Sequence, residues 1–150
     1  MTDKSNDIGW KPYDLDYYAQ ELVSEFRNTK DVLNESHKMR MTIAYGLERF
    51  WGEHLRLEKD KKEKADYWRA VWNRLYEILR DAEVNLPNDN VKSNLSDKEK
   101  RKEEEKNKIK AMAKQIWKMK LEDQRVALMV LTQLCDSLVW WTQRYKTKGD

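Results

Sequence analysis

The chain has few of the residues that break or cross-link a fold. It contains one cysteine, two prolines and four glycines among its 150 residues. The single cysteine, Cys135, excludes an internal disulfide and fits a reducing compartment. Four scattered glycines cannot form the glycine-rich loop that cradles phosphates in nucleotide-binding enzymes. No apolar run approaches the roughly 20 residues of a membrane span, and no signal peptide is evident. We therefore expect a cytoplasmic protein without a membrane partner.

The sequence also lacks a candidate catalytic or metal centre. Its two histidines, His37 and His54, are predicted to lie on different faces of one helix, and Cys135 is distant in sequence. A metal site needs several such ligands at matched spacing, so we expect no metal and no cofactor. His54 lies on an apolar line and Cys135 on an apolar helix, and both are better explained as packed core residues. We expect a protein that is not an enzyme.

Charged and aromatic residues are plentiful. Charged residues make up 38% of the chain, against roughly 25% in an average domain. A disordered chain would be poor in aromatics, whereas this one has seven Trp and seven Tyr. Good helix formers dominate, and the length suits one domain. The composition therefore predicts a folded, single-domain, all-α protein.

Apolar spacings of three and four residues predict five helices, over about residues 13–28, 34–57, 68–82, 96–117 and 123–145. Ser96 and Glu99 fit a capping box, and Asp123 fits a cap for the last helix. Residues 85–95, with Pro87 and several Asn, are the one clear loop. The first turns of the 96–117 helix are almost wholly charged, so we expect them to project from the body or to meet a polar partner.

The last helix is apolar over most of its circumference, which is typical of a central helix. We therefore expect residues 12–150 to form a bundle of about five helices around it. Residues 1–11 read as a flexible polar tail, whose end Trp10 and Tyr13 could anchor.

Two lines of basic residues run at helical spacing and are the strongest functional signal. They comprise Lys38, Arg49 and Arg56, with Thr42, Tyr45 and Gly52 between them, and Arg69 and Arg80, with Asn73 and Tyr76 between them. Each line would form an outer helix face opposite an apolar one. If the two faces adjoin, they offer a track for a phosphate backbone, with no element that reads base edges. The alternative is that both are ordinary solvated faces.

Gly46 and Gly52 lie within the predicted 34–57 helix, where each costs about 1 kcal/mol relative to Ala. Such costs indicate close contact with a neighbouring helix or with the backbone of a ligand. A further row, Lys110, Lys114 and Lys118, contains lysine alone.

Several aromatic residues are difficult to place in one core. Trp140 and Trp141 are adjacent and therefore about 100° apart on a helix, and Trp51 next to Phe50 has the same problem. Large aromatics off the core face are typical of protein interfaces, so we predict an interface at Trp51, Trp140, Trp141 and Tyr145. Burial on both sides of a central helix would explain them equally well.

Two segments resemble a known family. They are Ser36-His37-Lys38-Met39-Arg40-Met41, and Leu134 to Trp141 followed by Arg144-Tyr145-Lys146. The first resembles the start of a core helix, and the second the last helix, in the small subunit of type III-A (Csm-type) CRISPR effector complexes. The chain departs from that family in its many Trp residues and in the charged extension Asp97 to Lys108.

The resemblance implies a compact helical bundle that does not cut RNA. Several copies would stack along the ribonucleoprotein complex and contact the backbone of the guide RNA and the target RNA. The large polymerase-like subunit and the backbone subunits would be partners in this antiviral defence. Arg40, and with it Lys38, are the RNA-facing positions that the matching motif supports. A helical protein–protein adaptor with no nucleic-acid role remains the alternative.

Overall fold

The computed structural model describes residues 12–146, and the expected tail at 1–11 with Trp10 lies outside this range. The described chain is all-α, as predicted, with no strand in residues 12–146. Its α-helices are α1 (Pro12–Phe26), α2 (Glu35–Thr42), α3 (Leu47–Glu58), α4 (Lys62–Asp81), α5 (Lys98–Trp117) and α6 (Leu121–Tyr145), with a short 3-10 helix η2 (Ile43–Tyr45) after α2. The described part therefore has six α-helices rather than the five expected.

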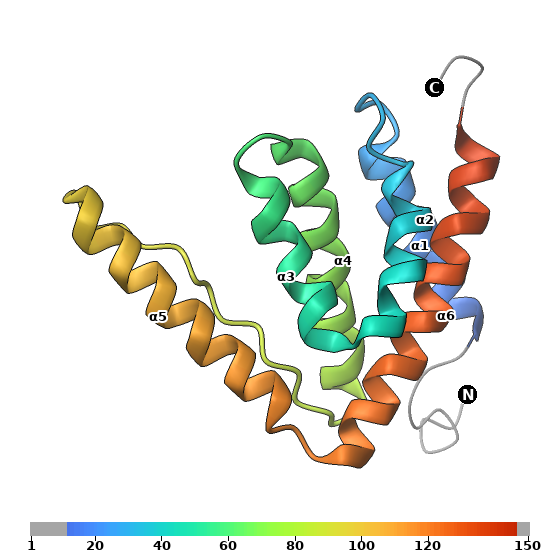
Figure 1. The fold of residues 1–150 in the computed structure, drawn as a ribbon. Helices are drawn as coiled ribbons and strands as arrows, with labels where there is room; N and C mark the ends of the chain where they lie inside the picture. Colours follow the sequence, from blue (N-terminus) through green and yellow to red (C-terminus); the bar gives the residue numbers. More distant parts are fainter. Residues whose placement is uncertain (1–11, 147–150) are drawn as a thin grey trace.

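The additional helix arises because the predicted 34–57 helix is broken at Gly46. This residue has φ 98° and ψ 171°, a combination that is essentially confined to glycine. The chain reverses there, so that α2 lies along α6 while α3 packs against α4 (Figure 1). The apolar spacing runs on through the break, since Met39, Ile43, Leu47 and Phe50 are all buried. A single continuous helix was therefore the wrong prediction.

The body of the protein is built around α6 and the α3–α4 pair. Helix α6 contacts α1, α2, α3 and α4, in agreement with the central place expected for it. Its buried side chains include Val130, Leu134 and Leu138. Its outer side is left open, because Met129 and Trp140 are exposed.

A small polar cluster lies within this apolar core. Ser36 Oγ lies 2.6 Å from Tyr67 Oη and 2.6 Å from Thr142 Oγ1, and all three side chains are buried. The three hydroxyls satisfy one another and join α2, α4 and α6. Buried polar groups of this kind are tolerated because they are hydrogen-bonded.

Helix α5 projects away from the bundle, as its charged first turns predicted. Figure 1 shows it splayed from the body, with the extended segment 82–97 running beside it. Its hydrogen bonds go to that segment: Lys108 Nζ donates to the Lys92 carbonyl at 3.1 Å, and Glu105 accepts from the Ser93 N–H at 2.9 Å. Only Met112, Ala113 and Ile116 of α5 are buried.

The two predicted caps were misplaced. Asp97, and not Ser96, caps α5, because its carboxylate accepts from the backbone N–H groups of Glu99 and Lys100. Helix α6 begins at Leu121, so Asp123 lies within its first turn, where an acidic residue interacts favourably with the helix dipole. None of the helices within residues 12–146 combines the length and the apolarity needed to cross a bilayer.

Candidate nucleic-acid interface

The first basic line does not form one straight face. Lys38 lies on α2, whereas Arg49 and Arg56 lie on α3, beyond the reversal at Gly46. These three residues therefore do not follow one another along a single helix face, as the sequence had predicted. Lys38 pairs with Glu35 on its own helix, whereas Arg56 pairs with Glu53.

Glu35 is a buried carboxylate with several donors around it. It is 1% exposed, and it accepts a hydrogen bond from Trp68 Nε1 at 2.9 Å. Lys38 and Lys64 place their ammonium nitrogens 3.2 and 3.5 Å from Glu35 Oε2. Oε2 accepts no hydrogen bond from the described residues, so its burial is compensated by the charges of these ammonium groups from α2 and α4.

Arg56 is held mainly by its own helix. Its guanidinium forms an ion pair with Glu53 one turn earlier. This hydrogen bond, together with the charges of Glu53 and Glu35, raises the pKa of Arg56. A phosphate reaching Arg56 would have to compete with Glu53.

Arg49 and Arg56 flank a shallow hollow on the outer face of α3. The hollow is lined by these two arginines with Glu48, Gly52 and Glu53. Gly52 forms its floor, and a Cβ built there would meet only Glu48 Oε2, at 3.7 Å. No neighbouring helix within residues 12–146 therefore explains this glycine, in contrast to Gly46, which the turn requires. Arg49 lies over the exposed ring of Tyr45, with Cζ 5.4 Å from the ring centroid.

The second basic line does not adjoin the first. Arg69 is half-buried in a pocket formed with Trp51 and His54, on a face of α3 that does not carry the Arg49–Arg56 hollow. Asn73 accepts a hydrogen bond from Asn88 at 3.1 Å, so its carbonyl is engaged within the fold. Arg80 is exposed and lies over Tyr76, 5.6 Å from the ring centroid. The two lines do not make one continuous track.

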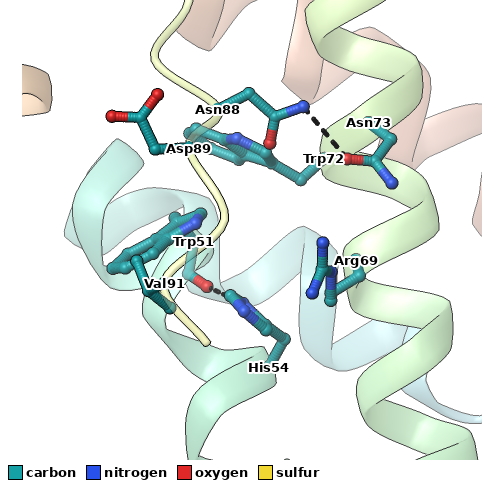
Figure 2. Close-up of a pocket in the computed structure, with 8 residues that line it drawn as sticks. All are labelled: Trp51, His54, Arg69, Trp72, Asn73, Asn88, Asp89 and Val91. Carbon is teal, nitrogen blue, oxygen red and sulfur yellow. Dashed lines mark hydrogen bonds between the residues drawn. The ribbon is translucent and has the colours of Figure 1, made fainter. Parts of the chain in front are cut away.

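The pocket beside Arg69 fastens the 82–97 segment to the bundle. Figure 2 shows Asn88, Asp89 and Val91 of that segment against side chains of α3 and α4. Trp72 Nε1 donates to the Pro87 carbonyl at 3.1 Å. The enclosed space has room for about one water molecule, so the pocket is a packing contact and not a ligand site.

His54 is a core histidine, as predicted. It is 5% exposed, and its Nδ1 lies 2.6 Å from the Trp51 carbonyl, to which a neutral ring can donate. Burial lowers its pKa. Cys135 is also fully buried, and burial raises the pKa of its thiol. Within residues 12–146 no group of three or more His, Cys, Asp or Glu side chains is arranged to hold a metal.

The aromatic residues predicted at an interface fall into different environments. Trp51 is 3% exposed, so its assignment to an interface was wrong; the 82–97 segment covers it. Trp140 is 58% exposed, as an interface residue would be. Trp141 and Tyr145 are half-buried with ring centroids 5.5 Å apart, and Gln20 of α1 donates to Tyr145 Oη at 2.6 Å.

Arg40, the residue best supported by the resemblance, is engaged with α6. Its Nε lies 2.6 Å from Asp136 Oδ1, and both side chains are well exposed. The arginine joins α2 to α6 and remains at the surface.

The four lysines at 106, 110, 114 and 118 were not among the predicted site residues. All four are exposed, and none has an ion-pair partner among the described residues. We call Lys106, Lys110, Lys114 and Lys118 the lysine row. Trp117 beside it is 67% exposed. The regular spacing was visible in the sequence, but the absence of partners was not.

Comparisons of the chain with protein-family models, with curated proteins and with solved structures found no match.

Proposed function

We propose that this chain is a non-catalytic, RNA-binding small subunit of a type III CRISPR effector complex in the cytoplasm. The segments containing Arg40 and Trp140, which resemble the Csm-type small subunit, are the basis for the choice of complex. Its partners would be the guide and target RNA backbones, the large polymerase-like subunit, the backbone subunits and further copies of itself.

The main structural support for RNA binding is the hollow formed by Arg49, Gly52 and Arg56. A glycine inside a helix costs about 1 kcal/mol relative to Ala, and among the described residues the space beside Gly52 is approached by the side chain of Glu48, whose Oε2 would lie 3.7 Å from a Cβ built there, and by no neighbouring helix. A phosphate seated there could approach the helix backbone closely between two guanidinium groups, which bind phosphate in a bidentate manner. Such contacts position a backbone and carry no sequence information.

The direct test is the salt dependence of binding to a labelled single-stranded RNA. Replacing Arg49 and Arg56 together by Gln should reduce the slope of log K against log salt by about 1.4, since each neutralised phosphate contributes about 0.7 for a single strand. The matched control is Arg27→Gln with Arg144→Gln, because these arginines lie over aromatic rings, as Arg49 does, but on another surface. An unchanged slope in the Arg49/Arg56 variant would rule out RNA binding at this hollow.

The choice of complex is tested in the cell of origin. The tagged protein should recover RNAs that carry CRISPR-repeat sequence, together with a polymerase-like large subunit. Recovery of proteins without such RNA would instead support the alternative, a helical adaptor that binds only protein. The exposed side chains of Met41, Tyr45, Met129 and Trp140 on α2, η2 and α6 favour that second candidate, because exposed apolar surface is typical of protein interfaces.

A further inference from the structure

We propose that the outer face of α5 is a second contact for single-stranded RNA, in which the lysine row binds phosphates and Trp117 stacks on a base. This inference rests on the proposed RNA-binding function and adds a site separate from the Arg49–Gly52–Arg56 hollow. It gives a role to the projecting helix, in which the chain departs from the family it resembles.

The first support is the local charge. Residues 106–120 contain six lysines and no acidic residue. The lysine row advances four residues at a time, so neighbouring ammonium groups stand about 6 Å apart along the helix axis. A run of cations with no acidic residue between them lowers the free energy of a phosphate chain laid along it; the nearest carboxylates are those of Glu103 to Glu105 before the row and of Asp89, which accepts from Gln115.

The second support is that these cations are not engaged within the fold. Arg40, Arg56 and Lys38 each pair with a carboxylate. The lysine row has no such partner among residues 12–146. Lys108, which is not in the row, is the lysine of this stretch that turns inward, to Glu104 and to the Lys92 carbonyl. Binding of a phosphate to the row therefore requires no internal ion pair to break.

The third support is the position of Trp117. It follows Lys110 by seven residues and Lys114 by three, so it lies on the same helix face as both. Its side chain is 67% exposed, whereas the apolar neighbours Met112 and Ile116 are buried against the body. An exposed indole beside phosphate-binding cations is suited to stacking on an unpaired base.

The ligand class follows from the composition of this face. A duplex would present no free base to Trp117, so a single strand is favoured. An anionic membrane surface requires a broad apolar helix face. Here Met112 and Ile116 of α5 are buried, and the large apolar side chains exposed near its C-terminal end are Trp117 and Leu121, the first residue of α6. Single-stranded RNA therefore fits the face better than a bilayer does.

The test uses the full chain and fluorescein-labelled oligouridylate, with anisotropy titrations between 50 and 200 mM KCl. The variant Lys110→Gln/Lys114→Gln/Lys118→Gln should reduce the slope of log K against log salt by about 2, from three lost phosphate contacts. The control Lys98→Gln/Lys100→Gln/Lys102→Gln makes the same charge change on the same helix among acidic neighbours, and should leave the slope unchanged. Circular dichroism should show all variants equally helical.

Stacking is tested separately by Trp117→Ala, which should weaken binding roughly tenfold without changing the slope. Trp140→Ala, which removes another exposed indole, from α6, should have no such effect. Equal reductions of the slope in the two lysine variants would overturn the inference, because they would indicate that RNA is attracted by the overall positive charge of α5 and not by the lysine row. Binding to phosphatidylserine vesicles in place of RNA would overturn it as well.

The two proposals can fail independently. If the wild-type chain does not bind the oligonucleotide, both fail. If the slope of log K against log salt falls in the Arg49/Arg56 variant and not in the lysine-row variant, the α5 contact alone is refuted.

Discussion

Arg40 on α2 donates to Asp136 on α6 with 2.6 Å between Nε and Oδ1. The same arginine has the best support as an RNA contact from the resemblance. Both side chains are substantially exposed, at 43% and 60%, so the pair is worth at most about 1 kcal/mol. A phosphate could therefore displace Asp136 from Arg40 at little cost, and the aspartate would act as a weak competitor of RNA.

Asp136→Asn should accordingly tighten RNA binding by up to about fivefold, because it frees Arg40 and removes a repelling charge. The measurement is the anisotropy titration at low salt. Asp81→Asn, which removes an exposed aspartate from the end of α4, is the control for net charge. If both variants tighten binding equally, Arg40 is not a specific contact.

Gly52→Ala should raise stability and weaken RNA binding at once. The substitution adds about 0.5–1 kcal/mol to the free energy of unfolding, because a helical glycine is replaced without a clash. The added methyl group narrows the hollow between Arg49 and Arg56. Urea titration reports the first effect and anisotropy the second; a stabilised variant with unchanged RNA affinity would show that no phosphate sits at Gly52.

Gly46→Ala is the contrasting case. Its φ of 98° is strained for any residue with a Cβ, so the variant should lose about 1–3 kcal/mol of stability. Urea unfolding measures the loss. An unaffected midpoint would mean that α2 and α3 can join by another backbone geometry.

Removal of the Ser36 hydroxyl should cost about 1–3 kcal/mol, since it leaves the buried hydroxyls of Tyr67 and Thr142 without their shared partner. Tyr67→Phe in the Ser36→Ala background should cost little more, because one of the stranded hydroxyls is removed with it. A double-mutant cycle by urea denaturation gives the coupling. Strictly additive costs would argue against a shared cluster.

Stability should fall in mild acid through His54. Its pKa is lowered in the folded state by burial, so the unfolded chain binds the proton more readily. The stabilising effect is fully present above the unfolded pKa, near 6.5, and is lost progressively as the pH falls below that value. His54→Gln should flatten the pH dependence of the urea midpoint between pH 7 and 5. An unaltered profile would show that a group other than His54 causes the loss of stability.

The sequence predicted the fold class correctly, but it did not predict the break between α2 and α3. Helical spacing located the apolar faces of α1, α4 and α6, because burial of those faces is what stabilises each helix. The same spacing concealed the break at Gly46. The apolar residues on both sides of the turn remain in phase, so periodicity alone cannot distinguish a reversal from a continuous helix. Only the cost of a glycine within the helix hinted at it.

The candidate site was harder to predict, because spacing identifies a helix face but not the partners of its charges. Arg69 and Arg80 share a spacing pattern, yet one enters a pocket and the other lies on the surface. Trp51 was assigned to an interface because it lies beside Phe50. It is buried because residues 82–97 return to cover it, and that long-range contact has no local signal. The lysine row of α5 lacks ion-pair partners because this helix projects from the bundle, and that arrangement has no local signal either.

The most direct measurement is the affinity of the wild-type chain for single-stranded RNA as a function of salt. We expect log K to fall linearly with log salt, with a slope that is smaller in the Arg49/Arg56 variant and in the lysine-row variant. The slope should be the same for oligonucleotides of different sequence. Absence of binding at 50 mM salt, or binding whose strength does not change with salt, would contradict this expectation.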